Sequence, residues 1–287
     1  MVGRSGNMYP RWHKAPKTER NSAEAFLKAR EKYCVSASAR FLSMKESRDH
    51  VWYLPGPGGG ISALLLHSRK TLFPLFDKKK DIPGPRFLNW FLGKAPIHAL
   101  QGLMKDAELL EALMENQNYY AAERIDYELM GIDETPRPQA FRAGPRGLTL
   151  RKPVPEDLES LFTLQSAYEQ EEVLPKNAVF NPAACRLNLE HILSSEQSLV
   201  AELDNQVVGK INTSAESFTR YQVGGVYVRP DCRGRGIAAS MTAFFVRELL
   251  SQGKGISLFV KKQNDAAIKV YRRTGFAILA DYRITYY

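Results

Sequence analysis

Long apolar runs are missing from this 287-residue sequence. The longest apolar stretches, such as residues 61–66, are far shorter than the roughly 20 residues that a membrane-spanning helix needs. The first seven residues carry no apolar core of the kind found in a secretory leader. We therefore expect a cytoplasmic protein without membrane association.

Cysteine and histidine are scarce and scattered. The three cysteines, Cys34, Cys185 and Cys232, are odd in number and far apart, which argues against a disulfide framework and favours free thiols. The five histidines show no metal-ligand spacing, no Gly-x-Ser-x-Gly elbow occurs, and no cysteine has a neighbouring histidine. These absences exclude the common zinc, serine-hydrolase and cysteine-nucleophile motifs, so we expect no metal cofactor.

Positive charge is in excess, and much of it lies at one end of the chain. The formal net charge is +9, and residues 1–20 hold five basic residues against one acidic residue. A short, polar, charged segment of this kind predicts a disordered tail. A solvated tail explains the charge better than a nucleic-acid arm does, so we do not expect nucleic acid as a partner.

Length and composition predict two compact domains. Residues 131–147 contain three prolines and three glycines and show no apolar periodicity, which is typical of a linker. We therefore place a linker at 132–146. It separates an N-terminal α+β domain at 21–131 from a C-terminal domain at 147–287.

The C-terminal domain has the pattern of a mixed α/β (α+β) fold. A strand at 148–151 precedes two amphipathic helices and three strands, and a helix at 236–251, a strand at 256–260, a helix at 265–273 and closing strands at 276–287 follow. The predicted order is βααβββαβαβ. We expect a mixed, mostly antiparallel central sheet flanked by helices.

The N-terminal domain has a similar order of predicted elements. Two interpretations stay open: a degenerate second copy of the C-terminal fold, or an unrelated α+β domain with the same element count. The loop before its central helix reads Asp81-Ile-Pro-Gly-Pro85. Proline has no N–H group, so this loop lacks the backbone donors that a bound phosphate needs.

The most informative segment is the loop at 229–240, Arg-Pro-Asp-Cys-Arg-Gly-Arg-Gly-Ile-Ala-Ala-Ser. Gly234 and Gly236 let the backbone approach an anion, and the N–H groups that open the following helix attract negative charge. Arg233 and Arg235 can neutralise further phosphate charge. The segment predicts a pyrophosphate site.

Two well-known phosphate loops fit this segment poorly. The Gly-Lys-Ser/Thr of a Walker A loop is absent. A dinucleotide-binding fingerprint is matched formally by Gly234-x-Gly236-x-x-Ala239, but an apolar strand at 256–260 stands where a ribose-binding acid belongs. Neither nucleotide motif therefore explains the loop.

The triplet Arg233-x-x-Gly236-x-Ala238 resembles the acetyl-CoA signature of the GNAT superfamily of N-acetyltransferases, Gln/Arg-x-x-Gly-x-Gly/Ala. It stands at the superfamily's usual place, between the fourth strand and the long third helix. The resemblance covers residues 148–287. It implies a GNAT fold for this domain, with acetyl-CoA as co-substrate.

A second motif of the superfamily follows downstream. Asn264-x-x-Ala267-x-x-x-Tyr271-x-x-x-Gly275-Phe276 is similar to it, with a strand of the right length between the two motifs. Two further segments, at 124–130 and 171–175, resemble more loosely the corresponding sequences of bacterial two-lobed GNAT proteins, whose N-terminal lobe is degenerate.

The resemblance implies which residues bind the coenzyme. The strand before the loop holds the pantetheine arm through its backbone, and the loop and the next helix hold the pyrophosphate. The expected coenzyme-binding residues are Val226, Tyr227, Val228, Arg233, Gly234, Arg235, Gly236, Ile237, Ala238, Ala239, Ser240, Asn264, Ala267 and Tyr271.

Three residues are candidates for catalysis. A phenol is protonated at neutral pH, so Tyr271 is the expected general acid for the departing thiolate. Glu171 and Glu172 lie between the first two helices, where the superfamily lines its acceptor pocket, and either is a candidate base. The alternative reading of both acids is a solvated helix end, and Asn264 equally fits a simple helix N-cap.

The predicted function is an N-acetyltransferase that moves an acetyl group from acetyl-CoA to a primary amine by direct attack. The acceptor is a small molecule or a protein, and the sequence specifies neither its identity nor an oligomeric state. The alternative is a catalytically weak or inactive protein that uses the fold to bind coenzyme A or a partner.

Overall fold

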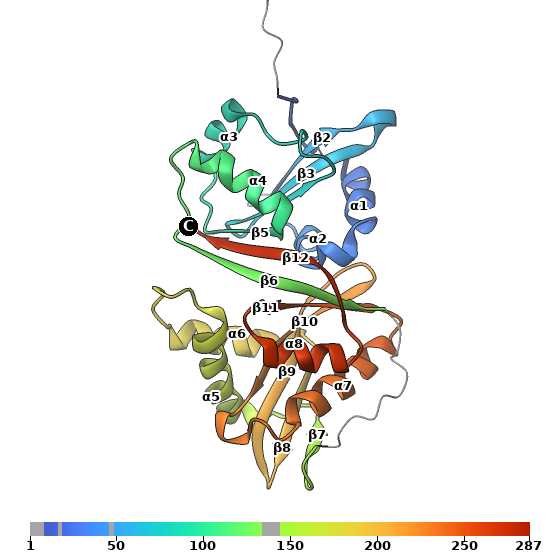
Figure 1. The fold of residues 1–287 in the computed structure, drawn as a ribbon, viewed down its shortest axis with the longest axis vertical. Helices are drawn as coiled ribbons and strands as arrows, with labels where there is room; N and C mark the ends of the chain where they lie inside the picture. Colours follow the sequence, from blue (N-terminus) through green and yellow to red (C-terminus); the bar gives the residue numbers. More distant parts are fainter. Residues whose placement is uncertain (1–8, 17–18, 46–48, 134–143) are drawn as a thin grey trace, which may run out of the picture. The chain divides into compact units, whose positions relative to one another are not determined.

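A computed structural model describes most of the chain (Figure 1). The described residues are 9–16, 19–45, 49–133 and 144–287. The predicted tail at 1–20 and the predicted linker at 132–146 therefore lie in part outside the described residues.

The chain divides into two compact units. Unit 1 consists of Met1–Glu128 together with Ala280–Tyr287, and unit 2 consists of Leu129–Leu279. The polypeptide thus returns to unit 1 after completing unit 2.

Unit 1 contains a sheet in the order β1-β2-β3-β4-β5-β12, followed by the first part of β6. The pairs β1–β2, β2–β3, β3–β4 and β5–β12 are antiparallel, and the pair β4–β5 is parallel. The strands are β1 (His13–Lys14), β2 (His50–Pro55), β3 (Ile61–Ser68), β4 (Thr71–Phe76), β5 (Ala99–Leu103), β6 (Glu123–Ile132) and β12 (Ala277–Tyr286).

Helices cover both faces of the unit 1 sheet (Figure 1). The consecutive leucines 64–66 of β3 are all fully buried, as expected for a strand that is covered on both sides. The helices are α1 (Arg20–Lys28), α2 (Val35–Leu42), α3 (Pro85–Leu92) and α4 (Met104–Glu115).

The last strand of the chain completes unit 1. Residues 282–286 of β12 pair antiparallel with residues 99–103 of β5. Tyr282 is 2% exposed, and the Thr285 hydroxyl donates to Glu111 on α4. The sequence analysis assigned all of 276–287 to the C-terminal domain, whereas the structure places Ala280–Tyr287 in unit 1. The residue pattern of this segment predicted a strand but could not indicate which strand it pairs with.

Unit 2 contains a sheet in the order β11-β10-β9-β8-β7. Only β10 and β11 are parallel, and the other neighbours are antiparallel. The strands are β7 (Thr149–Arg151), β8 (Ser198–Leu203), β9 (Gln206–Glu216), β10 (Arg220–Val228) and β11 (Gly255–Lys261). The mixed, mostly antiparallel sheet predicted from the sequence is confirmed.

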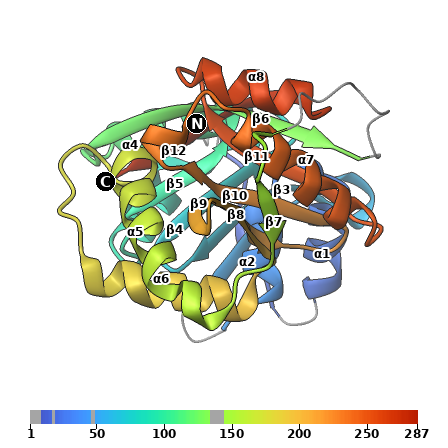
Figure 2. The same ribbon diagram turned by 90° about the horizontal axis from the view of Figure 1, so that it is seen from below.

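In the described part of unit 2, helices flank the sheet on both faces, two on each (Figure 2). One pair is α5 (Leu158–Tyr168), which continues into a π-helical turn at Glu169–Val173, and α6 (Pro182–Ser195). The other pair is α7 (Ile237–Leu250) and α8 (Asp265–Arg273).

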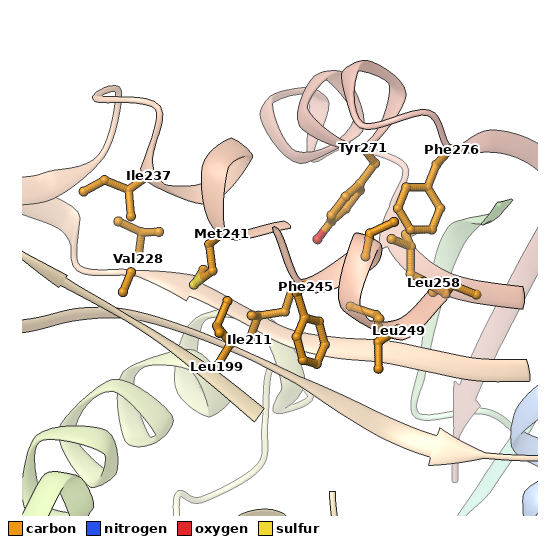
Figure 3. Packing of buried hydrophobic residues seen from close by; sticks show 14 of the residues in the cluster. Leu199, Ile211, Val228, Ile237, Met241, Phe245, Leu249, Leu258, Tyr271 and Phe276 are labelled. Atoms are coloured by element: carbon orange, nitrogen blue, oxygen red, sulfur yellow. The ribbon is translucent and has the colours of Figure 1, made fainter. Parts of the chain in front are cut away.

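The core of unit 2 forms where α7 meets the sheet (Figure 3). Met241, Phe245 and Leu249 recur every four residues on one helix face and are each at most 2% exposed. They pack against strand residues such as Leu199 and Ile211. This burial anchors α7, so the position of its N-terminus is set by the core.

No helix among the described residues combines the length and the apolar character that crossing a bilayer requires.

We predict that Tyr282→Ala destabilises unit 1 by about 3–5 kcal/mol, the cost of removing a buried aromatic ring. Ile278 lies in the same strand but is 41% exposed, so Ile278→Ala is the matched control and should cost less than about 1 kcal/mol. Urea unfolding would measure both, and hydrogen exchange should localise the loss to unit 1. Equal losses in the two variants would contradict this assignment.

Candidate active site

The pairing of β10 with β11 ends part of the way along both strands. Residues 220–223 pair in register with 255–258, and no further pairing between the two strands is present in the described part of the chain. The remainder of β10, Gly224–Val228, therefore forms no backbone pairing with β11 along that edge. This edge is where the sequence predicted the pantetheine arm.

A β-bulge interrupts β10 at the same place. The register with β9 shifts between Gly224 and Tyr227, so Gly225 and Val226 have no Cα partners there. Gly225 has φ +59°, in the left-handed region that favours glycine. A Cβ atom at this position would lie 2.0 Å from Asn212 Oδ1, so only glycine fits. Bulges of this kind often adjoin functional sites.

Residues 233–235 of the predicted phosphate loop are exposed, whereas Cys232 and Ile237 in the same segment are buried. Gly234 and Gly236 have φ values of +75° and +84°, and a Cβ at either would meet nothing within 4 Å. Gly236 is the N-cap of α7 and provides no side-chain hydrogen bond to the first turn. The helix start is thus open to an anion from solvent.

Arg233 is engaged by three neighbours. Its Nη1 and Nη2 donate to Glu171 Oε1 and Oε2 at 2.9 and 2.8 Å, and its Nε donates to the Val228 carbonyl at 3.0 Å. Its guanidinium also lies 5.1 Å from the ring centroid of Tyr227. Arg235, in the same loop, is exposed.

The two predicted bases, Glu171 and Glu172, have different surroundings. The hydrogen-bonded Arg233 guanidinium holds the pKa of Glu171 below its ordinary value, which makes Glu171 a weaker base. Glu172 instead accepts from Asn264 Nδ2 at 3.3 Å and lies 3.4 Å from Lys261 Nζ. Together the acids link the π-helical turn to the ends of β10 and β11.

Tyr271 lies on α8 and is 7% exposed (Figure 3). Its ring meets Phe276 edge-on with centroids 5.9 Å apart, and burial, followed by the charges of Tyr168 and Glu172, raises its pKa. The phenol therefore stays protonated at neutral pH. At the start of α8, Asn264 Oδ1 accepts from Ala267 N at 3.0 Å, which confirms the predicted N-cap.

The sequence analysis missed a buried polar cluster beside the bulge, formed by Tyr168, Lys210, Asn212 and Gly225. Lys210 Nζ donates to Asn212 Oδ1 at 3.2 Å and to the Gly225 carbonyl at 3.0 Å. Two cues were available: a lysine between the apolar residues Val208 and Ile211 of a predicted strand, and two adjacent glycines inside the next strand, which are typical of a bulge.

Unit 1 has a cavity of about 670 Å³ between β4 and β5, lined by none of the predicted site residues. Four carboxylates outnumber two cations in its lining, and burial raises the pKa of Asp106 there to about 6. This charge is a poor match for coenzyme phosphates. The charged lining residues are Arg30, Asp77, Lys105, Asp106, Glu108 and Asp281.

No cluster of three or more histidine, cysteine or carboxylate side chains suited to a metal ion occurs within residues 9–16, 19–45, 49–133 and 144–287.

We predict that Gly225→Ala destabilises the protein more than Gly234→Ala does. Both residues have positive φ, which costs alanine roughly 1 kcal/mol, but only the Gly225 side chain would also collide with Asn212 and Lys210. We expect a total of about 2–4 kcal/mol at Gly225. Denaturant unfolding would compare the two variants, and equal costs would show that the bulge relaxes freely.

The chain is similar to known acetyltransferases. The sequence profile of the acetyltransferase (GNAT) family matches residues 158–276. A mycothiol acetyltransferase of Cellulomonas flavigena is 25% identical over 167 residues, which cover 52% of this chain and 46% of that protein. The chain thus spans about half the length of this relative.

Two solved structures share the fold across both units. A GCN5-related N-acetyltransferase from Sphaerobacter thermophilus aligns with a TM-score of 0.59 at 17% identity, covering 96% of this chain and 94% of that one. A tandem GNAT protein from the clavulanic acid biosynthesis pathway aligns with a TM-score of 0.57 at 12% identity, covering 96% and 97%. At these identities the likeness concerns the fold alone. The part of the chain that matches the acetyltransferase (GNAT) family, residues 158–276, contains the predicted phosphate loop and Tyr271.

Proposed function

We propose that unit 2 transfers an acetyl group from acetyl-CoA to a primary amine by direct attack. One observation carries the proposal: the segment 229–236 joins the end of β10 that no longer pairs with β11 to α7, and the N-cap of α7, Gly236, has open space beside it. A phosphate site and a free strand edge are thus adjacent. A coenzyme with a diphosphate and an amide-bearing arm matches both.

The coenzyme would bind along this edge. The backbone of Val226, Tyr227 and Val228 would hydrogen-bond the pantetheine amides, and the first N–H groups of α7 would bind the pyrophosphate. Gly234 and Gly236 leave open space for this approach. The expected loop and helix contacts are those of residues 233–240, with Asn264, Ala267 and Tyr271 along α8.

The chemical step requires three events. The neutral amine attacks the thioester carbon and forms the C–N bond, the C–S bond breaks, and the amine loses one proton while the thiolate gains one. Tyr271 would supply the thiolate proton, because its buried phenol is protonated at neutral pH. Backbone N–H groups of the bulged strand would stabilise the negative charge on the carbonyl oxygen.

The acids of the π-helical turn would serve the acceptor side. Of the two, Glu172 is the better candidate base, because Arg233 lowers the pKa of Glu171. We assign Glu171 instead to holding Arg233, and thereby the phosphate loop, in place. The acceptor would be the amine of a small molecule or of a protein, and the setting would be the cytoplasm.

Tyr271→Phe tests the general acid. We expect kcat to fall by about 100-fold or more with acetyl-CoA binding retained, since the variant removes only the proton donor. Thiol release across a panel of amines would measure turnover, and calorimetry would measure binding. Tyr282→Phe, which alters another buried tyrosine, in unit 1, is the control and should keep full activity.

The same measurements separate the alternatives. A wild-type rate equal to that of Tyr271→Phe on every amine would favour a coenzyme-binding protein without catalysis. Absence of any heat with acetyl-CoA or longer acyl-CoA would refute the proposed function.

Glu171→Gln tests whether Glu171 acts as the general base or only positions Arg233 through their ion pair. We expect kcat to change by less than about threefold and acetyl-CoA affinity to shift by at most about fivefold, the range of an exposed ion pair. Because the pKa of Glu171 is lowered, the pair persists at neutral pH and is lost only as pH falls through that lowered pKa. Glu172→Gln is the matched variant, and a far larger kcat loss in Glu171→Gln would make Glu171 the base.

A further inference from the structure

Side chains, and not a neighbouring strand, hold the backbone of Gly225. Its carbonyl accepts from Lys210 Nζ at 3.0 Å, and its N–H donates to the Tyr168 hydroxyl at 3.3 Å. Both polar groups of this bulge residue are therefore satisfied from β9 and α5. Removing either partner would leave a buried peptide group without a bond.

Lys210 is an unusual residue for this position. It is 4% exposed, its Nζ lies 4.7 Å from the ring centroid of Tyr168, and no ion pair with a carboxylate is present for it in the residues that the structure describes. Burial lowers its pKa to about 7, although the charges of Glu169 and Cys185 oppose this shift. These two groups and Tyr168 are the titratable side chains that act on it from the surrounding helices.

Burying this lysine costs stability. Because its pKa is lower in the folded state than in the unfolded state, the cost is fully present below about pH 7 and disappears only as pH rises toward the unfolded-state pKa. A methionine of similar length would fill the space without that cost. A residue that weakens the fold where an apolar one would serve is expected mainly at functional sites.

The geometry of the peptide unit shows what Lys210 controls. In a trans peptide the C=O of one residue and the N–H of the next are coplanar and point in opposite directions. The chain has no cis peptide in its described residues, so the Gly225 carbonyl and the Val226 N–H are linked in this way. Lys210 holds the carbonyl toward the α5 side, which directs the Val226 N–H away from it.

We propose that Lys210 is a positioning residue for acetyl transfer: by holding the Gly225 carbonyl, it aims the Val226 N–H at the oxygen of the bound thioester. This rests on the proposed function, which places the acyl group beside the bulge. Asn212 and Tyr168 complete the arrangement, since they hold the Lys210 ammonium and the Gly225 N–H.

Lys210→Met tests the proposal. We expect kcat to fall by about 10- to 100-fold, as for a catalytic group that is misplaced by about an ångström. KM for acetyl-CoA should change by less than about threefold, and Tm at pH 7 should stay unchanged or rise. A packing residue would show the opposite: a lower Tm with full kcat. Lys210→Gln keeps a donor without the charge and should recover part of the lost kcat.

Lys254→Met is the matched control. This lysine also lies in unit 2 and over a tyrosine ring, but it pairs with Glu216 at the other end of β9. Its removal should leave kcat unchanged. Hydrogen exchange of the segment 223–228 provides a readout that needs no substrate, and only Lys210→Met should accelerate it.

The outcomes separate the two proposals. If wild-type protein neither binds nor turns over acetyl-CoA, the proposed function fails, and hydrogen exchange alone then decides whether Lys210 holds the bulge. If wild-type protein is active, unchanged kcat in Lys210→Met overturns the positioning role while leaving the acetyltransferase intact. A lower Tm with unchanged kcat would make Lys210 a packing residue.

Discussion

The parting of β10 from β11 is the constraint on which the site in unit 2 depends. The two strands pair over only four residues each, and the bulge at Gly225 begins directly afterwards. A strand that leaves its neighbour must satisfy its backbone by other means. On one side β9 and the Tyr168 side chain of α5 do so, and on the other side Gly224–Val228 are not paired with β11.

The core decides where the phosphate loop lies. Because α7 is anchored by Met241, Phe245 and Leu249, its N-terminus has a set position relative to the end of β10. The loop between them needs two glycines with positive φ to make the connection. A rigidly packed helix and a conformationally permissive loop therefore adjoin each other at the proposed diphosphate site.

Charge is distributed differently in the two units. In unit 2 the acids of the π-helical turn are matched by Arg233 and Lys261, so the phosphate loop keeps Arg235 exposed for an anion. In unit 1 the cavity between β4 and β5 is lined mainly by carboxylates. The charges beside these two features therefore differ, which favours unit 2 for the proposed chemistry.

Much of this could be predicted from local sequence, and some of it could not. The positive-φ glycines, the Asn264 cap and the order of strands and helices depend on residues close in the chain, so backbone sterics and apolar periodicity determine them. The Arg233–Glu171 pair, the hold of Lys210 on Gly225 and the pairing of β12 with β5 join residues 62, 15 and about 180 positions apart. Only tertiary packing decides these contacts. Strand register and helix placement bring these side chains together, and the sequence around one partner does not indicate which residue the other partner is.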